Sequence, residues 1–248
     1  MNVINAAAPI LTIENMAAGY GDVDIVSGID LHVKPREIVT IAGTNGAGKS
    51  TVIKAVMGLL PRLSGSITFD GNDLRRSAVE DRVRLGISYV PQVQNVFGEL
   101  TVLENLQVVE HVSDARRRTE EMFELFPALA QRRRTHAANL SGGERQQLAF
   151  ARALMPSPRM VLLDEPSAAL SPALTSQVFE EVQRLPQLDI AVLMVEQRAR
   201  QALAFSDRGY ILDSGRIVLT DTGPNLLANE EMAELYIGHR HDSQGEPV

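Results

Sequence analysis

The chain has 248 residues, of which 44% are hydrophobic, and its formal net charge is −7. A chain of this length can bury one sizeable core and is short for two independent domains. The negative charge argues against a protein that coats nucleic acid. The sequence contains no cysteine, which excludes disulfides and cysteine-ligated metals and suits a reducing compartment.

Neither a membrane span nor a secretory signal is visible in the sequence. No apolar run approaches the roughly 18 residues that a spanning helix needs. The first basic residue is Lys34, so the start lacks the positive region of a secretory signal. We therefore expect a chain that does not cross a bilayer by itself.

The first 85 residues predict short strands on both sides of one helix. A β-branched apolar run favours a buried strand, and the helix after it is expected to end at Pro61. Gly71-Asn72 is typical of a turn between strands. The expected strands are 10–16, 29–33, 37–42 and 66–69, and the expected helix is 50–60.

A glycine-rich segment between this strand and this helix fits the pattern G-x-x-x-x-G-K-[ST]. Its glycines let backbone N–H groups converge on phosphates, while Lys49 can reach the β- and γ-phosphates and the Ser50 hydroxyl can ligate Mg²⁺. The strand–loop–helix order aims a helix N-terminus at the phosphates, which a chance glycine-rich turn would not do. The predicted nucleotide-binding residues are Gly43, Thr44, Asn45, Gly46, Ala47, Gly48, Lys49, Ser50 and Thr51.

From about residue 96 to 138 the hydrophobic period shifts towards 3.6, and glycine is scarce after Gly98. This change predicts a helical subdomain inserted into an α/β core. Two arginine clusters, 116–118 and 132–134, lie inside it. Solvated helix faces are the favoured interpretation, and docking against acidic lipid or a partner loop is the alternative.

Ser141, Gly142, Gly143 and Glu144 form a second candidate anion site. Ser-x-x-Glu before an apolar-periodic stretch is a capping box, which needs no ligand. The glycine pair goes beyond a cap, because each glycine costs a helix roughly 1 kcal/mol against alanine. An anion docking at this helix start would explain the pair, and we favour that hypothesis over the cap alone.

Two carboxylates follow the apolar run 159–163. Because alternate side chains on a strand point to opposite faces, Asp164 and Glu165 are expected to have different roles. Asp164 would hold Mg²⁺ together with Ser50 of the glycine-rich segment, and Glu165 would polarise the water that attacks the γ-phosphate. A strand that ends in a solvated acidic turn is the simpler alternative.

Beyond residue 140 the pattern alternates between helix and strand, which predicts a parallel sheet with crossover helices. The expected strands are 160–163 and 190–195, and helices are expected from Gly142 and over 172–185 and 198–205. Residues 223–237 predict two short helices, and the polar end after Gly238 is expected to be disordered.

Taken in order and spacing, Gly43–Thr51, Leu140–Gln146 and Val161–Pro166 resemble the Walker A, signature and Walker B motifs of ATP-binding cassette (ABC) ATPases. The resemblance spans residues 10–238. It implies one ATPase domain of the α/β P-loop NTPase class, with an antiparallel β subdomain and an inserted helical subdomain over about 96–138. It further implies that two cassettes sandwich two MgATP molecules, each bound by one P-loop and the other chain's signature helix.

The family also implies roles for two further residues. Tyr20 occupies the position of the aromatic residue that stacks on adenine, although a half-buried tyrosine at a strand end would look the same. Gln92 occupies the position of the loop glutamine that contacts Mg²⁺ and the attacking water and senses the transporter subunit.

Two positions depart from the common family pattern. Gln197 stands where most cassettes have a histidine, and Ser171 stands where an aspartate is usual. An amide can donate to a γ-phosphate but carries no proton at neutral pH, so we expect Gln197 to bond to the γ-phosphate and help position the attacking water. The simpler alternative is that Gln197 only begins the following helix. With the strings 207–212 and 221–223, these departures are similar to the second ATPase subunit of branched-chain amino acid importers. Residues 93–98 fit that subgroup less well, so the substrate stays open.

This resemblance implies a set of partners and a location. The partners are a second ATPase subunit (a sister or the same chain), two transmembrane permease subunits and, indirectly, an extracytoplasmic solute-binding protein. The chain would then be cytoplasmic and peripheral on the inner face of the plasma membrane. A soluble cassette ATPase that is not coupled to transport is the alternative, although such proteins usually carry tandem cassettes or long coiled insertions and neither is visible.

Overall fold

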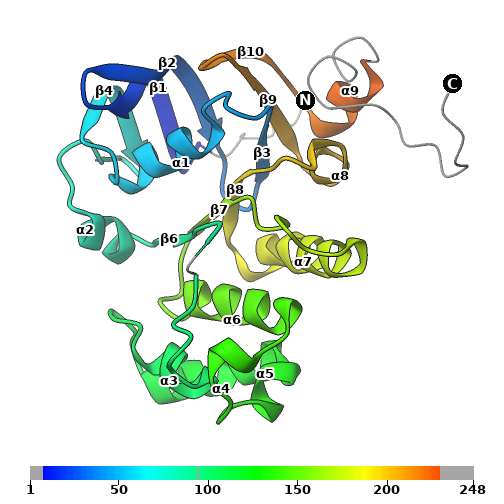
Figure 1. Ribbon diagram of the computed structural model, residues 1–248. Helices are drawn as coiled ribbons and strands as arrows, with labels where there is room; N and C mark the ends of the chain where they lie inside the picture. Colours follow the sequence, from blue (N-terminus) through cyan, green and yellow to red (C-terminus); the bar gives the residue numbers. More distant parts are fainter. Residues whose placement is uncertain (1–7, 94, 230–248) are drawn as a thin grey trace, which may run out of the picture.

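A computed structural model describes residues 8–93 and 95–229, which form two sheets with helices packed on either side (Figure 1). One sheet has four strands in the order β2-β1-β4-β5, and the other has six in the order β10-β9-β3-β8-β7-β6. The first sheet is antiparallel. In the second sheet β6, β7, β8, β3 and β9 run parallel, and β10 is antiparallel to β9. The predicted α/β cassette fold is confirmed.

The strands of the first sheet are β1 (Leu11–Tyr20), β2 (Val23–Val33), β4 (Arg62–Phe69) and β5 (Asn72–Asp73). Those of the second are β3 (Ile38–Ala42), β6 (Ile87–Val90), β7 (Met160–Asp164), β8 (Ala191–Val195), β9 (Arg208–Asp213) and β10 (Arg216–Asp221). The sequence patterns predicted β1 to β4, β7 and β8, mostly with shorter bounds, and missed β5, β6, β9 and β10. Single short segments of this kind have no clear period, and only their partners make them strands.

The helices are α1 (Lys49–Met57), α2 (Val79–Arg84), α3 (Val102–Gln107), α4 (Ala115–Leu125), α5 (Pro127–Gln131), α6 (Gly142–Leu154), α7 (Pro172–Arg184), α8 (Ala199–Leu203) and α9 (Gly223–Ala228). Short 3₁₀ turns occupy Ala137–Asn139 and Leu185–Leu188. None of these helices is long and apolar enough to cross a membrane. Helix α9 matches the first of two predicted C-terminal helices, while the second and the expected disordered tail lie outside the described residues.

Two predicted boundaries are wrong. Helix α1 ends at Met57 and not at residue 60 as predicted. Gly58 ends it, because this residue takes the left-handed conformation (φ 72°) and its N–H bonds back to the Ala55 and Lys54 carbonyls. The turn of the β4–β5 hairpin is Asp70-Gly71, one residue before the predicted Gly71-Asn72, since both residues have positive φ (48° and 78°).

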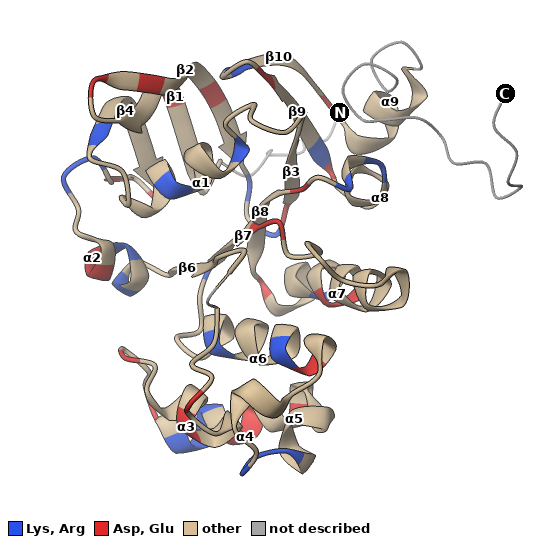
Figure 2. Ribbon diagram, viewed as in Figure 1, with Lys and Arg blue, Asp and Glu red and all other residues tan. Residues whose placement is uncertain are grey.

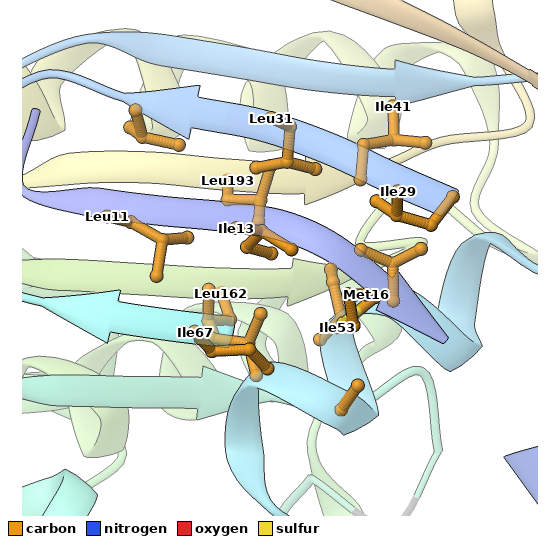
Figure 3. Close-up of a cluster of buried hydrophobic side chains, with 14 of the residues drawn as sticks. Leu11, Ile13, Met16, Ile29, Leu31, Ile41, Ile53, Ile67, Leu162 and Leu193 are labelled. Atoms are coloured by element: carbon orange, nitrogen blue, oxygen red, sulfur yellow. The ribbon is translucent and has the colours of Figure 1, made fainter. Parts of the chain in front are cut away.

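The parallel sheet separates two hydrophobic clusters. Alternate residues of β7 point to opposite sides: Leu162 joins the cluster under the antiparallel sheet and α1, and Leu163 joins the cluster formed with α3 to α7. Figure 3 shows the first cluster, where Ile13 and Ile67 of the antiparallel sheet lie against Leu193 and Leu162 of the parallel sheet, respectively. Because both faces are covered, the open edge at the carboxyl ends of β3, β7 and β8 is where polar groups can gather.

Candidate nucleotide site

The P-loop runs from the carboxyl end of β3 to the start of α1. Two of its glycines cannot be replaced without a clash, which shows how closely the loop is packed. A Cβ on Gly48 (φ 98°) would lie 2.5 Å from Val26 Cγ1, and one on Gly43 (φ 154°) would lie 2.0 Å from the Leu212 carbonyl oxygen. Gly48 is also the N-cap of α1 and offers no side-chain cap, so the first amides of this helix stay free of a protein side chain.

Lys49 is buried at the mouth of this loop. Its ammonium donates to the carbonyl oxygens of Gly43 (3.0 Å) and Thr44 (2.9 Å). Burial lowers the pKa of Lys49, and the nearby carboxylates, chiefly Glu165, oppose that shift. A cavity of about 250 Å³, lined by P-loop residues, Ile25 and Glu165, opens in front of it. A cation, free amides and open space together suit a polyanion such as the phosphates of a nucleotide.

Ser50 and Asp164 form a pair suited to Mg²⁺. The Ser50 hydroxyl donates to Asp164 Oδ1 at 2.7 Å, and Tyr89 donates to Asp164 Oδ2 at 3.2 Å. Burial raises the pKa of Tyr89, which keeps its hydroxyl a donor. Among the described residues no group of three or more acidic, histidine or cysteine side chains could hold a metal alone. The pair therefore fits an ion that takes its remaining ligands from phosphate and water.

Glu165 differs from Asp164 for a reason other than the predicted strand alternation. Strand β7 ends at Asp164, and Glu165 takes a left-handed backbone conformation (φ 49°) while its N–H bonds to the Val195 carbonyl at 2.9 Å. This bend places its carboxylate at the cavity. Gln92, which follows β6, donates from Nε2 to Glu165 Oε2 at 2.8 Å. The structure thus brings Gln92, Glu165, Asp164, Ser50 and Lys49 together.

Gln197 lies exposed just after β8 and is not among the residues that line the cavity. Its neighbour Glu196, which the sequence reasoning passed over, is fully buried and accepts hydrogen bonds from the Ser167 and Arg198 amides. Its only sequence signal is an acidic residue directly after an apolar strand. Ser171 serves as the N-cap of α7 and accepts from the Leu174 amide (3.4 Å), a role that aspartate fills equally well.

Tyr20 belongs to an exposed apolar strip beside the P-loop. It pairs with Val23 across the hairpin, so their side chains share one face of the sheet, and Ile25 continues the strip into the cavity. The three side chains are 49%, 62% and 39% exposed. Sequence reasoning found Tyr20 and missed Val23 and Ile25, although apolar residues two apart before a turn are the signal. Such a strip suits a flat aromatic base.

The second predicted anion site lies apart from the first. Ser141 is the N-cap of α6 and forms the complete capping box with Glu144: the Glu144 amide donates to Ser141 Oγ at 3.2 Å, and Glu144 Oε2 accepts from the Ser141 amide at 2.8 Å. Gly143 has a packing reason, because a Cβ there would lie 2.6 Å from Leu174 Cδ2. A Cβ on Gly142, in contrast, would meet nothing closer than 3.8 Å. None of these four residues lines the P-loop cavity, so one chain does not bring the two devices together.

Four of the six arginines in the two clusters lie beside acids on the same surface. Arg117 and Arg118 bond to Glu121, Arg133 pairs with Glu120, and Arg132 lies 3.4 Å from Glu144. Figure 2 shows the two signs of charge interspersed over α3, α4 and α6. This mixture agrees with solvated helix faces and does not form a basic patch.

Comparison with known proteins agrees with this geometry. Residues 26–168 match the ABC transporter family model. The high-affinity branched-chain amino acid transport ATP-binding protein BraG of Pseudomonas aeruginosa is 40% identical over 232 residues, which are 92% of this chain and all of BraG. The lipopolysaccharide export system ATP-binding protein LptB of Haemophilus influenzae is 35% identical, over 93% of this chain and 98% of LptB.

The fold has a solved counterpart in the crystal structure of a nucleotide-free ATP-binding cassette from an ABC transporter. The TM-score is 0.81 at 28% identity, over 94% of this chain and all of the other. The family match, the relatives and the shared fold all agree with the features described above: the P-loop, the Asp164–Glu165 pair and the capped start of α6. The chain therefore belongs to the ABC transporter family, as one of its ATP-hydrolysing subunits.

Proposed function

We propose that this chain is the motor subunit of an importer for branched-chain amino acids or related small polar solutes, at the cytoplasmic face of the membrane. The observation that supports a working motor is that Lys49, Ser50 and Glu165 line one cavity, with Asp164 hydrogen-bonded to Ser50 and Gln92 to Glu165. The observation that favours this substrate class is the 40% identity to BraG over its whole length, together with the Gln197 and Ser171 substitutions.

In this proposal each polar group has one chemical task. Lys49 and the α1 amides bind the β- and γ-phosphates, and the Tyr20 strip holds the adenine. Ser50 and Asp164 would hold Mg²⁺, with Gln92 close by, and the ion would supply positive charge for the phosphate oxygens. Glu165 accepts a proton from the attacking water, and Gln92 and Gln197 orient that water by hydrogen bonds.

The exposed start of α6 completes the site from a second subunit. Ser141, Gly142 and Gly143 would contact the γ-phosphate of ATP bound to the P-loop of the partner, whether that partner is the same chain or a sister ATPase. Their position outside the P-loop cavity of their own chain supports this arrangement. Glu144 would act indirectly, since its carboxylate is engaged in the capping box.

A cleft beside Gln92 supplies a docking place for a permease segment. Its volume is about 430 Å³, and it lies between β6 and α6, with Tyr89, Phe97 and Val108 in its lining. The guanidinium of Arg152 lies 4.4 Å from the centre of the Phe97 ring, which gives the floor a fixed cation–π contact. A segment bound there would contact the loop that carries Gln92, and the hydrogen bond from Gln92 to Glu165 would transmit a movement of this loop to Glu165.

Reconstitution tests this proposal. The chain, expressed with candidate permeases and a second ATPase, should co-purify with them and drive ATP-dependent leucine or valine uptake into proteoliposomes that contain the binding protein. Glu165→Gln should abolish uptake without disrupting the complex. Extraction of a lipid from the vesicles would instead indicate export, the process for which the relative LptB is named. ATPase activity without permease partners would indicate the soluble alternative.

A further inference from the structure

Glu196 is a buried carboxylate that ties two loops together. It follows the last residue of β8 and its side chain is completely inaccessible to solvent. One carboxylate oxygen accepts a hydrogen bond from the Ser167 amide at 3.0 Å, and the other accepts from the Arg198 amide at 3.2 Å. Each oxygen therefore serves a different segment, and the two segments are about thirty residues apart in the chain.

Both loops carry groups of the nucleotide site. Ser167 lies two residues after Glu165, and Arg198 directly follows Gln197. A second contact joins the same loops, because the Arg198 guanidinium donates to the Leu170 carbonyl at 2.9 Å. The Glu196 amide also bonds to the Ile41 carbonyl of β3 at 3.3 Å, which fixes this junction to the strand that enters the P-loop.

This junction needs two acceptors. An unpaired carboxylate is costly to bury, and burial raises the pKa of Glu196 while the hydrogen bonds from the loops oppose that shift. A glutamine of the same shape has one acceptor and one donor, so its NH₂ group would face one of the two amides. If the position only had to fill space, an apolar side chain would do so at lower cost.

We propose that Glu196 is a positioning residue for ATP hydrolysis: it sets the distance and angle between the Glu165 loop and the Gln197 loop around the γ-phosphate. This inference rests on the proposed roles of Glu165 and Gln197. Binding of ATP depends on the P-loop, whereas the Glu196 carboxylate bonds to the Ser167 and Arg198 amides of the two loops beside it. Loss of its carboxylate therefore affects the transition state, where alignment of base, water and γ-phosphate matters most.

The test compares Glu196→Gln with the matched control Glu37→Gln. The Glu37 carboxylate is also buried (8% exposed), accepts a backbone N–H (Lys34, 2.6 Å) and pairs with Arg208, but it precedes β3 at the opposite edge of the sheet. Glu196→Gln should lower kcat about 10- to 100-fold with KM and nucleotide affinity nearly unchanged. Glu37→Gln should leave kcat within about twofold, although both variants lose a buried carboxylate and shift the unfolding temperature.

Two further variants keep the outcome decisive. Glu196→Ala removes both acceptors and should be slower than Glu196→Gln. Arg198→Ala breaks the second tie without touching the carboxylate and should also lower kcat at unchanged affinity, even if the Glu196 variants do not fold. Wild-type kcat in a folded Glu196→Gln protein, or equal losses in Glu37→Gln, overturns the inference. Glu165→Gln, assayed beside them, separates failure of the proposed catalytic site from failure of the inference about Glu196. Wild-type turnover in Glu165→Gln would reject the proposed site. An inactive Glu165→Gln with a fully active Glu196→Gln would reject only the role of Glu196.

Discussion

Helices α1 and α6 both begin at glycine-rich segments, yet they leave their first amides in opposite states. At α1 the N-cap is Gly48 and no side chain caps the helix, and a lysine, two carboxylates and a cavity of about 250 Å³ surround the free N–H groups. At α6 the Ser141–Glu144 capping box already serves two donors, and the helix packs in the other hydrophobic cluster. The first helix start leaves its amides open towards the cavity, and the second is capped by side chains of its own segment.

The difference shows how a capping box and an anion site can coexist. The capping box uses the Ser141 and Glu144 amides, while a Cβ added to Gly142 would meet nothing closer than the Leu170 and Leu174 side chains at 3.8 Å, so this side of its backbone can still be approached. An incoming phosphate would therefore meet an already ordered helix start and need not order it. The following variants separate the two helix starts, from the largest expected effect to the smallest.

Glu165→Gln tests the catalytic side of the α1 region. The amide cannot accept a proton, so kcat should fall about 10²- to 10⁴-fold at saturating MgATP while ATP affinity is retained. Steady-state ATPase assays with equilibrium nucleotide binding measure both quantities. Turnover at the wild-type rate would mean that another group is the base.

Lys49→Ala tests the binding side of the same region. It removes the cation that faces the phosphates, and a lost charge-assisted hydrogen bond corresponds to roughly 10- to 100-fold weaker ATP binding. Lys54→Ala, which changes a lysine in the last turn of the same helix, is the matched control and should bind normally. Titration with a fluorescent ATP analogue compares the three proteins, and equal affinities would reject the P-loop assignment.

Ser141→Ala tests whether the α6 start is more than a cap, and Thr101→Ala is its control. Thr101 forms the same capping box with Glu104 at the start of α3, with the same 3.2 and 2.8 Å contacts. Both variants should lower the free energy of unfolding by about 1 kcal/mol. Only Ser141→Ala should also lower the ATPase rate of the assembled dimer; parallel losses of rate in both variants would leave Ser141 a cap alone.

Glu181→Gln examines how α6 is anchored. Gln147 of α6 donates to Glu181 Oε1 of α7 at 2.9 Å, whereas the far end of α1 is held by Arg82, which does not titrate near neutrality. Burial raises the pKa of Glu181 from the ordinary 4.5 to about 7. A raised carboxyl pKa means that its contribution to stability is complete below about pH 4.5 and is lost as pH rises through 7.

The glutamine variant stays neutral, so it should be more stable than the wild type near pH 8, by at most about 3 kcal/mol. The difference should vanish below about pH 4.5, where the wild-type carboxyl is protonated in both the folded and the unfolded protein. Thermal unfolding of both proteins across this range measures it. A difference that does not change with pH would show that Glu181 has an ordinary pKa.

Short-range features were predictable from the sequence alone. The P-loop and the Ser141 capping box each depend on side chains and amides within a few residues, so their spacing along the chain determines their geometry. Apolar periods also identified the buried strands β3, β7 and β8, because a strand covered on both faces is apolar throughout. The α/β class and the cassette order of motifs followed from these local patterns.

Tertiary structure decided what depends on partners far along the chain. Glu165 faces the cavity because its backbone bends after β7 and bonds to β8, and Glu196 is a junction because residues 167 and 198 meet there. Strands β6, β9 and β10 exist because neighbouring strands complete their hydrogen bonds, and Tyr20, Val23 and Ile25 form one strip only once the hairpin aligns them. Local propensity cannot encode such contacts, since their free energy appears only when the distant segments pack together.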